Sequence, residues 1–271
     1  MIPKKIHYCW FGPAPKGEVE TKCIESWKKI LPDYEIREWN DADLEKFDNR
    51  YLKQAVSAGK WAFVSDYVRL YALMTEGGVY FDTDEEIRKP LDDFMSLDFF
   101  IGSQKCGSCR SISPALIGTL PGHQIIKDLI AAYDDIDFIN PDGSLNLTTN
   151  PMYFAKVFKE KYGIEDVFVT KDRVKITDNA YIYSYTYFCT DNADAYGVHH
   201  YTGSWKPDWN VREKLSIPLG KGKKLVVRKY KKNREGSKMP FNAGEKVLCS
   251  LKTSKRSKLF LLIQNNGENA C

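Results

Sequence analysis

The sequence predicts an α/β domain that carries a basic C-terminal extension, and three observations lead to this prediction. Short apolar runs with strand character alternate with longer stretches of helical spacing. One such run, residues 79–81, is followed at once by Asp82 and Asp84, and open α/β sheets place their ligands at the ends of such strands. Residues 211–260 hold 16 Lys and Arg against 3 Asp and Glu, a net charge of +13, whereas residues 1–210 have a net charge of −8.

Length and composition bound the architecture and the cellular compartment. A chain of 271 residues with 43% hydrophobic residues can form one sizeable domain with an appendage, and we divide it into residues 1–210 and 211–271. The sequence shows neither a long apolar run nor a signal peptide, and its seven cysteines are scattered without a disulfide framework. Both features predict a protein of the reducing cytosol. Cys106 and Cys109 are the one close pair, which favours a loop with two thiols over a metal or redox site.

The elements follow from local periodicity. Strands are expected where apolar residues are alternating or contiguous, and helices where they recur at helical spacing. The expected strands are residues 3–11, 34–39, 79–81 and 94–103, with a strand or extended segment at 181–188. The expected helices are 21–31, 60–75, 122–133 and 151–162, with Gly77 as the cap of the second and a polar loop at 104–113.

Asp82 and Asp84 are the strongest candidates for a metal site. Side chains at positions i and i+2 of a strand point the same way, so both carboxylates should face one spot. Two hard oxygen ligands suit Mg²⁺ or Mn²⁺, with a substrate diphosphate completing the coordination shell. The pattern alone is weak, because the pairs at 41–43 and 135–137 also match it, and these acids are expected to be solvated or to cap helices.

Two further groups of residues could belong to the same site. Asp66 and Arg69 lie three apart on one face of the expected helix 60–75, a spacing that most often forms an ordinary ion pair. This helix leads directly into the strand before Asp82, however, so the pair could also belong to the site. Residues 199–207 gather two histidines, a glycine and a lysine, which favours a site over an inert surface pair. Trp10, at the end of the first strand, could stack on a planar ligand, although composition favours a place in the core.

The basic extension contains one short apolar run, residues 259–263, flanked by lysines and an arginine. This run is too short to span a bilayer but could lie in its interface, and a solvated or partly disordered tail is the alternative. The charge itself predicts a polyanionic partner, either an anionic membrane surface or a nucleic acid.

Several of these segments together resemble a known family. Residues 2–12, the helix segment 62–71 with Asp66 and Arg69, and Gly77-Gly-Val-Tyr-Phe-Asp82-Thr-Asp84 resemble the Asp-x-Asp glycosyltransferases of the Och1-like, capsular-polysaccharide type (similar to glycosyltransferase family 32). The chain is more distantly similar to the clostridial glucosylating toxins and, at residues 200–207, to glycogenin-like transferases. One departure is Asn150, which stands where the family often has glycine.

This resemblance implies a GT-A fold, a Rossmann-like nucleotide-diphospho-sugar transferase domain, and transfer that retains the anomeric configuration. It implies residues that bind the donor sugar and its diphosphate, together with a bound Mn²⁺ or Mg²⁺ ion. A histidine would be the third protein ligand of this ion, and His200 is preferred over His199. The implied catalytic residues are Asp66, Arg69, Asp82 and Asp84. Tyr8, Trp10, Asp66, Arg69, Ser204, Trp205 and Lys206 are implied to bind the donor nucleotide, with UDP favoured, and Asp82, Asp84 and His200 to bind the metal.

The resemblance also implies the partners. The donor would be a nucleotide sugar, and the acceptor a saccharide or lipid-linked oligosaccharide of bacterial capsule or O-antigen synthesis. Residues 211–271 would then hold a cytoplasmic enzyme at the inner face of the membrane.

Three alternatives stay open at this point. A metal-dependent nucleotidyl- or phosphotransferase would also use paired aspartates, but would give no role to Asp66 and Arg69. A nucleic-acid-binding protein would use the basic extension, but residues 211–260 offer few aromatic platforms, so no nucleic acid is expected. An inactive sugar-binding relative would bind the donor without releasing the nucleotide.

Overall fold

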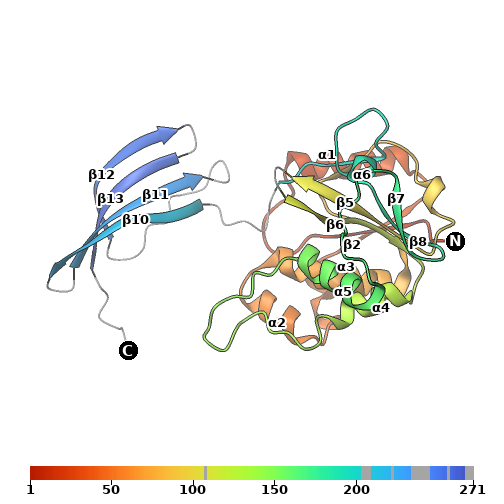
Figure 1. Ribbon diagram of the computed structural model, residues 1–271, viewed down its shortest axis with the longest axis horizontal. Helices are drawn as coiled ribbons and strands as arrows, with labels where there is room; N and C mark the ends of the chain where they lie inside the picture. Colours follow the sequence, from red (N-terminus) through yellow and green to blue (C-terminus); the bar gives the residue numbers. More distant parts are fainter. Residues whose placement is uncertain (107–108, 203–208, 221–222, 233–244, 255–256, 266–271) are drawn as a thin grey trace. The chain divides into compact units, whose positions relative to one another are not determined.

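The computed structural model describes residues 1–106, 109–202, 209–220, 223–232, 245–254 and 257–265 (Figure 1). Contacts divide the chain into two compact units, Met1–Thr202 and Gly203–Cys271, which are described separately here.

The first unit is built on a seven-stranded mixed sheet with the strand order β2-β1-β3-β6-β5-β8-β7. β1 lies parallel to both of its neighbours, β5 lies parallel to β8, and the remaining pairs are antiparallel. The strands are β1 (Lys5–Cys9), β2 (Glu35–Trp39), β3 (Gly78–Phe81), β5 (Phe99–Cys106), β6 (Cys109–Thr119), β7 (Arg173–Thr177) and β8 (Ala180–Tyr183). β4 (Glu85–Ile87) and β9 (Gly197–His199) form a separate two-stranded ribbon.

Helices cover both faces of this sheet (Figure 1). α1 (Glu18–Ile30) and α6 (Tyr185–Phe188) lie on one face, and the other face carries α2 (Arg50–Ser57), α3 (Trp61–Glu76), α4 (Gln124–Ala131) and α5 (Asn150–Tyr162). Short 3-10 helices run over Asp41–Lys46 and Asp92–Phe94. The predicted α/β class is therefore confirmed.

Strand β3 shows why the sheet needs two helical layers. All four of its residues are buried, which fits the contiguous apolar run in the sequence. Val79 and Phe81 belong to the core on the α1 side, whereas Tyr80 belongs to the core on the α3 side. Side chains two apart share a face, so the residue after Phe81 is directed with Tyr80 toward α3.

The turn from α3 into β3 depends on two glycines. Gly77 ends α3 with φ of 64°, and Gly78 begins β3 with φ of 94°. A Cβ atom at Gly78 would lie 2.5 Å from the carbonyl oxygen of Lys5 on β1. The pair therefore lets β3 start against β1 in a backbone conformation that other residues rarely adopt.

Two segments differ from the sequence prediction. Residues 104–106 and 109–113, which were expected to belong to a polar loop, are the paired ends of β5 and β6, where Gln104 Nε2 donates to Ser111 Oγ across the strands at 2.9 Å. The expected extended segment 181–188 is strand only as far as Tyr183. Ser184 then accepts the backbone N–H of Thr186 with its hydroxyl and starts the short helix α6.

The second unit contains a four-stranded antiparallel sheet with the order β10-β11-β13-β12. Its strands are β10 (Trp209–Gly220), β11 (Lys223–Lys232), β12 (Glu245–Ser254) and β13 (Ser257–Asn265). Val226, Phe260 and Leu262 are buried, so the apolar run 259–263 belongs to a central strand of a sheet rather than to a disordered tail. In the described part of the chain, every helix is too short or too polar to cross a membrane.

Candidate active site

Arg69 connects the helix α3 to the end of strand β3. Its guanidinium contacts Asp66 Oδ1 at 2.9 Å and Asp82 Oδ1 at 3.1 Å, and it donates to the carbonyl oxygen of Pro114 on β6 at 2.9 Å. The tyrosine two residues before Asp82 completes this cluster, because Tyr80 Oη donates to Asp82 Oδ1 at 3.0 Å. The predicted pair Asp66 and Arg69 is thus part of a buried network that includes the first carboxylate of the Asp-x-Asp motif.

Burial controls the charges of this network. Burial raises the pKa of Asp66 to about 7, against the opposing effect of Arg69. Burial alone would lower the pKa of Arg69, but Asp82, Tyr80 and Asp66 outweigh it and raise that pKa. Arg69 is therefore a permanent cation between two carboxylates, one of which holds its proton more tightly than a free aspartate does.

Asp82 and Asp84 lie on a turn rather than within a strand. β3 ends at Phe81, and the backbone N–H of Glu85 donates to the carbonyl oxygen of Asp82 at 2.9 Å. The two carboxylates do lie close together, as the sequence argument expected. Strand alternation is not the cause, because strand β3 ends at Phe81. The turn brings Asp84 back toward Asp82 and directs it to the ribbon strand β9.

Asp84 is held by residues more than a hundred positions later in the chain. His199 Nε2 lies 3.2 Å from Asp84 Oδ1, and Thr202 donates to Asp84 Oδ2 through both its backbone N–H, at 2.8 Å, and its hydroxyl, at 2.9 Å. Burial would raise the pKa of Asp84, but His199 and Thr202 outweigh it and lower that pKa to about 2. Asp84 is therefore a carboxylate at any physiological pH.

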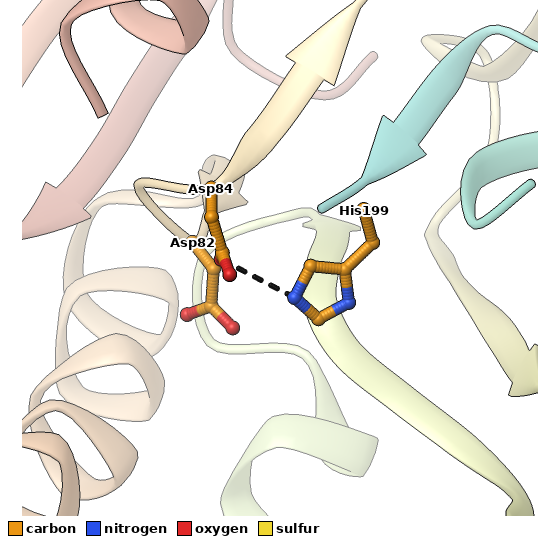
Figure 2. A group of neighbouring side chains, drawn as sticks. All are labelled: Asp82, Asp84 and His199. Atoms are coloured by element: carbon orange, nitrogen blue, oxygen red, sulfur yellow. Dashed lines mark ion pairs between the residues drawn. The ribbon is translucent and has the colours of Figure 1, made fainter. Parts of the chain in front are cut away.

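Asp82, Asp84 and His199 form a group suited to a metal ion (Figure 2). Each offers one ligand atom, and these atoms all lie within 4.8 Å of one another. Two carboxylates and one imidazole are ligands of divalent cations such as Mn²⁺, while Mg²⁺ more often takes oxygen ligands alone.

The neighbouring histidine does not join this group. In the register of the ribbon, His199 lies opposite Glu85 and Val198 lies opposite Glu86. His200 follows in the chain, and its Nε2 contacts Glu86 Oε2 at 2.9 Å on the exposed side. Because successive residues of an extended chain alternate, only one of the two histidines can face Asp84, and that one is His199 rather than the predicted His200.

Glu85 is fully buried beside this group. Burial raises the pKa of its carboxyl well above the usual value, with Asp84 and Asp82 adding to the effect. Glu85 therefore holds its proton more tightly than a free glutamate does.

The residues implied to bind the nucleotide base lie at the end of β1. Tyr8 is buried and donates its hydroxyl to Glu38, while Trp10 is half-buried with its indole N–H donated to Ala14 O at 2.8 Å. Lys16 Nζ lies over both rings, 5.6 Å from the Tyr8 centroid and 5.5 Å from that of Trp10. Ser204, Trp205 and Lys206 lie outside the described residues.

Sequence reasoning missed two residues that hold the site together. Tyr80 could have been found, because it lies two positions before Asp82. Thr202 had no such signal, since it is identified only by its contacts with Asp84, more than a hundred positions earlier in the chain. Asn150, the departure from the family pattern, is buried beside Asp66, and its Nδ2 donates to Tyr133 Oη at 2.5 Å.

The fold and the site define a class of protein: an α/β protein that presents paired aspartates, with a helix-borne Asp-Arg pair behind them. Comparison with known proteins then shows what the chain is similar to. Residues 17–100 match the model described as "glycosyltransferase sugar-binding region containing DXD motif", a span that includes α3, β3 and both motif aspartates. This part of the chain is therefore similar to the sugar-binding region of DXD glycosyltransferases.

Individual relatives are distant. The chain is similar to an uncharacterized glycosyltransferase of Acanthamoeba polyphaga mimivirus, with 23% identity over 76% of this chain and 85% of the relative. It is similar to inositol phosphoceramide mannosyltransferase 3 of Schizosaccharomyces pombe, with 25% identity over 58% of this chain and 45% of the relative. Among solved structures it is similar to the PaToxG glycosyltransferase, with 23% identity, a TM-score of 0.46, and coverage of 60% of this chain and 70% of that chain.

Proposed function

We propose that this protein transfers a hexose from a nucleotide sugar to a saccharide acceptor, with a divalent metal ion and with retention of the anomeric configuration. The observation that carries the proposal is the single connected network from Asp66 through Arg69 to Asp82, with Asp84 and His199 beside it. This network supports the proposal, because a residue that could bind the donor sugar, Asp66, is joined through Arg69 to residues that could bind a metal ion.

Asp82, Asp84 and His199 would hold the ion, Mn²⁺ or Mg²⁺. The fit rests on the donor set, since two carboxylates and one imidazole ring converge within 4.8 Å. When bound, the ion would act as a Lewis acid that stabilises the charge growing on the leaving diphosphate.

The other residues bind and orient the donor. Arg69 is a buried cation whose position is fixed by three partners, so it adds preorganised positive charge beside the diphosphate. Asp66 has oxygens suited to sugar hydroxyls, and its contact with Arg69 fixes its orientation. Trp10 would stack on the base and Lys206 would contact the diphosphate, as the resemblance implies. Attack from the face of the leaving group needs no covalent nucleophile, and we assign none.

For the donor we prefer one nucleotide base and name the sugars to test. Stacking on Trp10 suits uracil and favours a UDP-sugar. The names of two relatives, a mannosyltransferase and a mannosyl phosphorylinositol ceramide synthase, make mannose a second donor sugar to test.

The acceptor is proposed to be carried on a lipid. Capsule or O-antigen precursors, which the resemblance implies, and inositol phosphoceramide, which the relatives' names contain, are both lipids with a polar head. The net charge of +13 in residues 211–260 supports attachment of a cytoplasmic enzyme to an anionic membrane surface, where each basic residue contributes about 1 kcal/mol.

Nucleotide release from a panel of UDP- and GDP-sugars tests the proposal, with Mn²⁺ and with a chelator. We expect release from one donor, dependent on the metal and lost in Asp84→Ala. The matched control is Asp135→Ala, which removes an exposed aspartate from another Asp-x-Asp pair of the same chain and should leave release unchanged. The proposal would be contradicted if no donor released its nucleotide and no nucleotide sugar shifted the melting temperature of the protein.

A further inference from the structure

The first unit contains a cleft whose lining residues do not include Asp82, Asp84 or His199. It has a volume of about 700 Å³, within the range of ligand-binding clefts. Its main features are three aromatic rings and a small number of polar groups, from Lys89, Tyr185, Tyr187, Asn192, Asp194 and Tyr196.

Two of the rings that line the cleft lie parallel to each other at fixed positions. The rings of Tyr187 and Tyr196 are inclined by only 1°, with centroids 6.1 Å apart. Tyr187 donates its hydroxyl to Asp172 at 3.0 Å, and Tyr196 donates its hydroxyl to Asp93. Because both hydroxyls are bound to carboxylates outside the cleft, the ring positions are set before any ligand arrives, which lowers the entropic cost of binding.

The lining selects for a neutral, hydroxyl-rich ligand. Lys89 is the one cation among the described lining residues, and Asp194 lies 3.9 Å from its Nζ, so a polyanion gains little there. The described lining residues include no Leu, Ile, Val or Met, and their apolar surface comes mainly from the tyrosine rings. A sugar unit has C–H faces that pack on aromatic rings and hydroxyl groups that bond Lys, Asp, Asn and Thr side chains.

One residue that lines this cleft, Tyr196, directly precedes the ribbon strand that carries the metal-site histidine. His199 ends β9, whereas Tyr196 precedes it and accepts the backbone N–H of Arg88 at 2.8 Å. Three extended residues separate the two positions along the ribbon, which is about 10 Å. One oligosaccharide is long enough to span that distance.

We propose that the cleft bounded by Tyr187 and Tyr196 binds a saccharide unit of the acceptor, remote from the unit that receives the new sugar. This inference rests on the proposed function for the identity of the acceptor, but saccharide binding in the cleft can be measured without it. The cleft would raise the affinity for oligosaccharide acceptors over monosaccharides.

Direct binding is the first test. Short linear gluco- and manno-oligosaccharides are titrated onto the full-length protein without metal or donor, and binding is followed by ligand-observed NMR. We expect binding that weakens by about tenfold or more in Tyr196→Ala, corresponding to about 1.4 kcal/mol, and that is largely kept in Tyr196→Phe, which retains the ring. The matched control is Tyr162→Ala, which also loses a tyrosine bonded to a carboxylate, Asp128, but lies outside the cleft.

Kinetics separate a failure of this inference from a failure of the proposed function. With an active donor, Tyr196→Ala should raise KM for an oligosaccharide acceptor by about tenfold, with nucleotide release in the absence of acceptor unchanged. Acceptor KM equal to that of the wild type, or wild-type protein that binds none of the oligosaccharides, would overturn the inference. Absence of nucleotide release from every donor would instead overturn the proposed function, and the binding result would still decide the role of the cleft.

Discussion

At the scale of single residues, Arg69 is the side chain on which the site depends. It is almost fully buried, and its planar fork bonds two carboxylates and a backbone carbonyl at once. A lysine at this position would keep the charge but could not hold three partners in fixed directions. The sequence predicted the Asp66–Arg69 pair from helix spacing, but not that Arg69 also bonds Asp82.

The pH dependence of stability should report the burial of Asp66. Its pKa is about 7 in the folded protein, against an ordinary value of 3.8, so the folded state holds one more proton between these pH values. Stability from this group therefore falls as the pH rises from about 4 to 7. Asp66→Asn has no ionisable group at this position, so it does not lose this contribution. Between pH 4 and 7 the free energy of unfolding of the wild type should therefore fall by about 2–4 kcal/mol relative to that of Asp66→Asn.

Chemical unfolding at a series of pH values measures this difference, and Asp135→Asn supplies the control, because that aspartate is exposed. A gap between wild type and Asp66→Asn that does not change with pH would show that Asp66 is ionised throughout.

The two histidines show what the sequence could and could not predict at this scale. Residue types and their order predicted that residues 199–207 contribute to the site. Which of the two rings faces Asp84 depends on the register of β9 against β4, which involves residues more than a hundred positions apart. Local pattern contains no information about that register, and the resemblance favoured His200.

At the scale of elements, the unit formed by α3, Gly77, Gly78 and β3 positions the motif. Its helix and strand were predicted to within a few residues, because the helix has a strong apolar surface and the strand is a contiguous apolar run. The pairing of β5 with β6 and the four-stranded sheet of the second unit were not predicted, although residues 94–103 were expected to form a strand. β11 is lysine-rich, and its place in a sheet comes from pairing with β10 and β13 rather than from a local apolar pattern.

Two glycines with a similar positive φ allow a test of close approach. Gly77 has φ of 64° and Gly122 has φ of 66°, so alanine is strained at both. At Gly77 the new Cβ would lie 2.6 Å from Pro121 Cδ, whereas at Gly122 nothing lies within 4 Å. We expect Gly122→Ala to lower the free energy of unfolding by about 1–2 kcal/mol, and Gly77→Ala by about 1–3 kcal/mol more.

Equilibrium unfolding of the two variants side by side measures the difference. If both variants lost the same free energy of unfolding, the chain around Pro121 would have moved to make room for the methyl group. The close approach of α3 to this loop would then not constrain β3.

At the scale of the whole molecule, the charge is divided unequally along the chain. Residues 1–210 have a net charge of −8 and residues 211–260 a net charge of +13. The sequence predicted this division and a polyanionic partner, but not that the basic part folds as a sheet. A folded sheet holds its basic residues at fixed spacing along four strands, which a disordered tail does not.

Binding to lipid vesicles tests the membrane proposal. Full-length protein should bind vesicles that contain phosphatidylserine, should lose affinity as salt screens the charges, and should not bind neutral vesicles. Lys229→Gln together with Lys231→Gln should weaken binding by about 2 kcal/mol, roughly 30-fold. Lys159→Gln with Lys161→Gln, on α5 of the acidic unit, is the matched control and should have no effect.

Removal of residues 211–271 should abolish vesicle binding altogether. If the shortened protein binds anionic vesicles as well as the full chain does, the basic extension is not the membrane anchor.

The ribbon of β4 and β9 has one more consequence. These strands are three residues long, pair only with each other among the described elements, and hold Asp84 and His199 together. We expect such a short ribbon to separate more readily than the seven-stranded sheet does, which would give the site a joined and a parted state. The apparent affinity for the ion is then the intrinsic affinity multiplied by the joined fraction, and any molecule that bridges both strands raises that fraction. A metal ion and a donor that both contact the joined ribbon would in this way strengthen each other's binding, in addition to their direct contact.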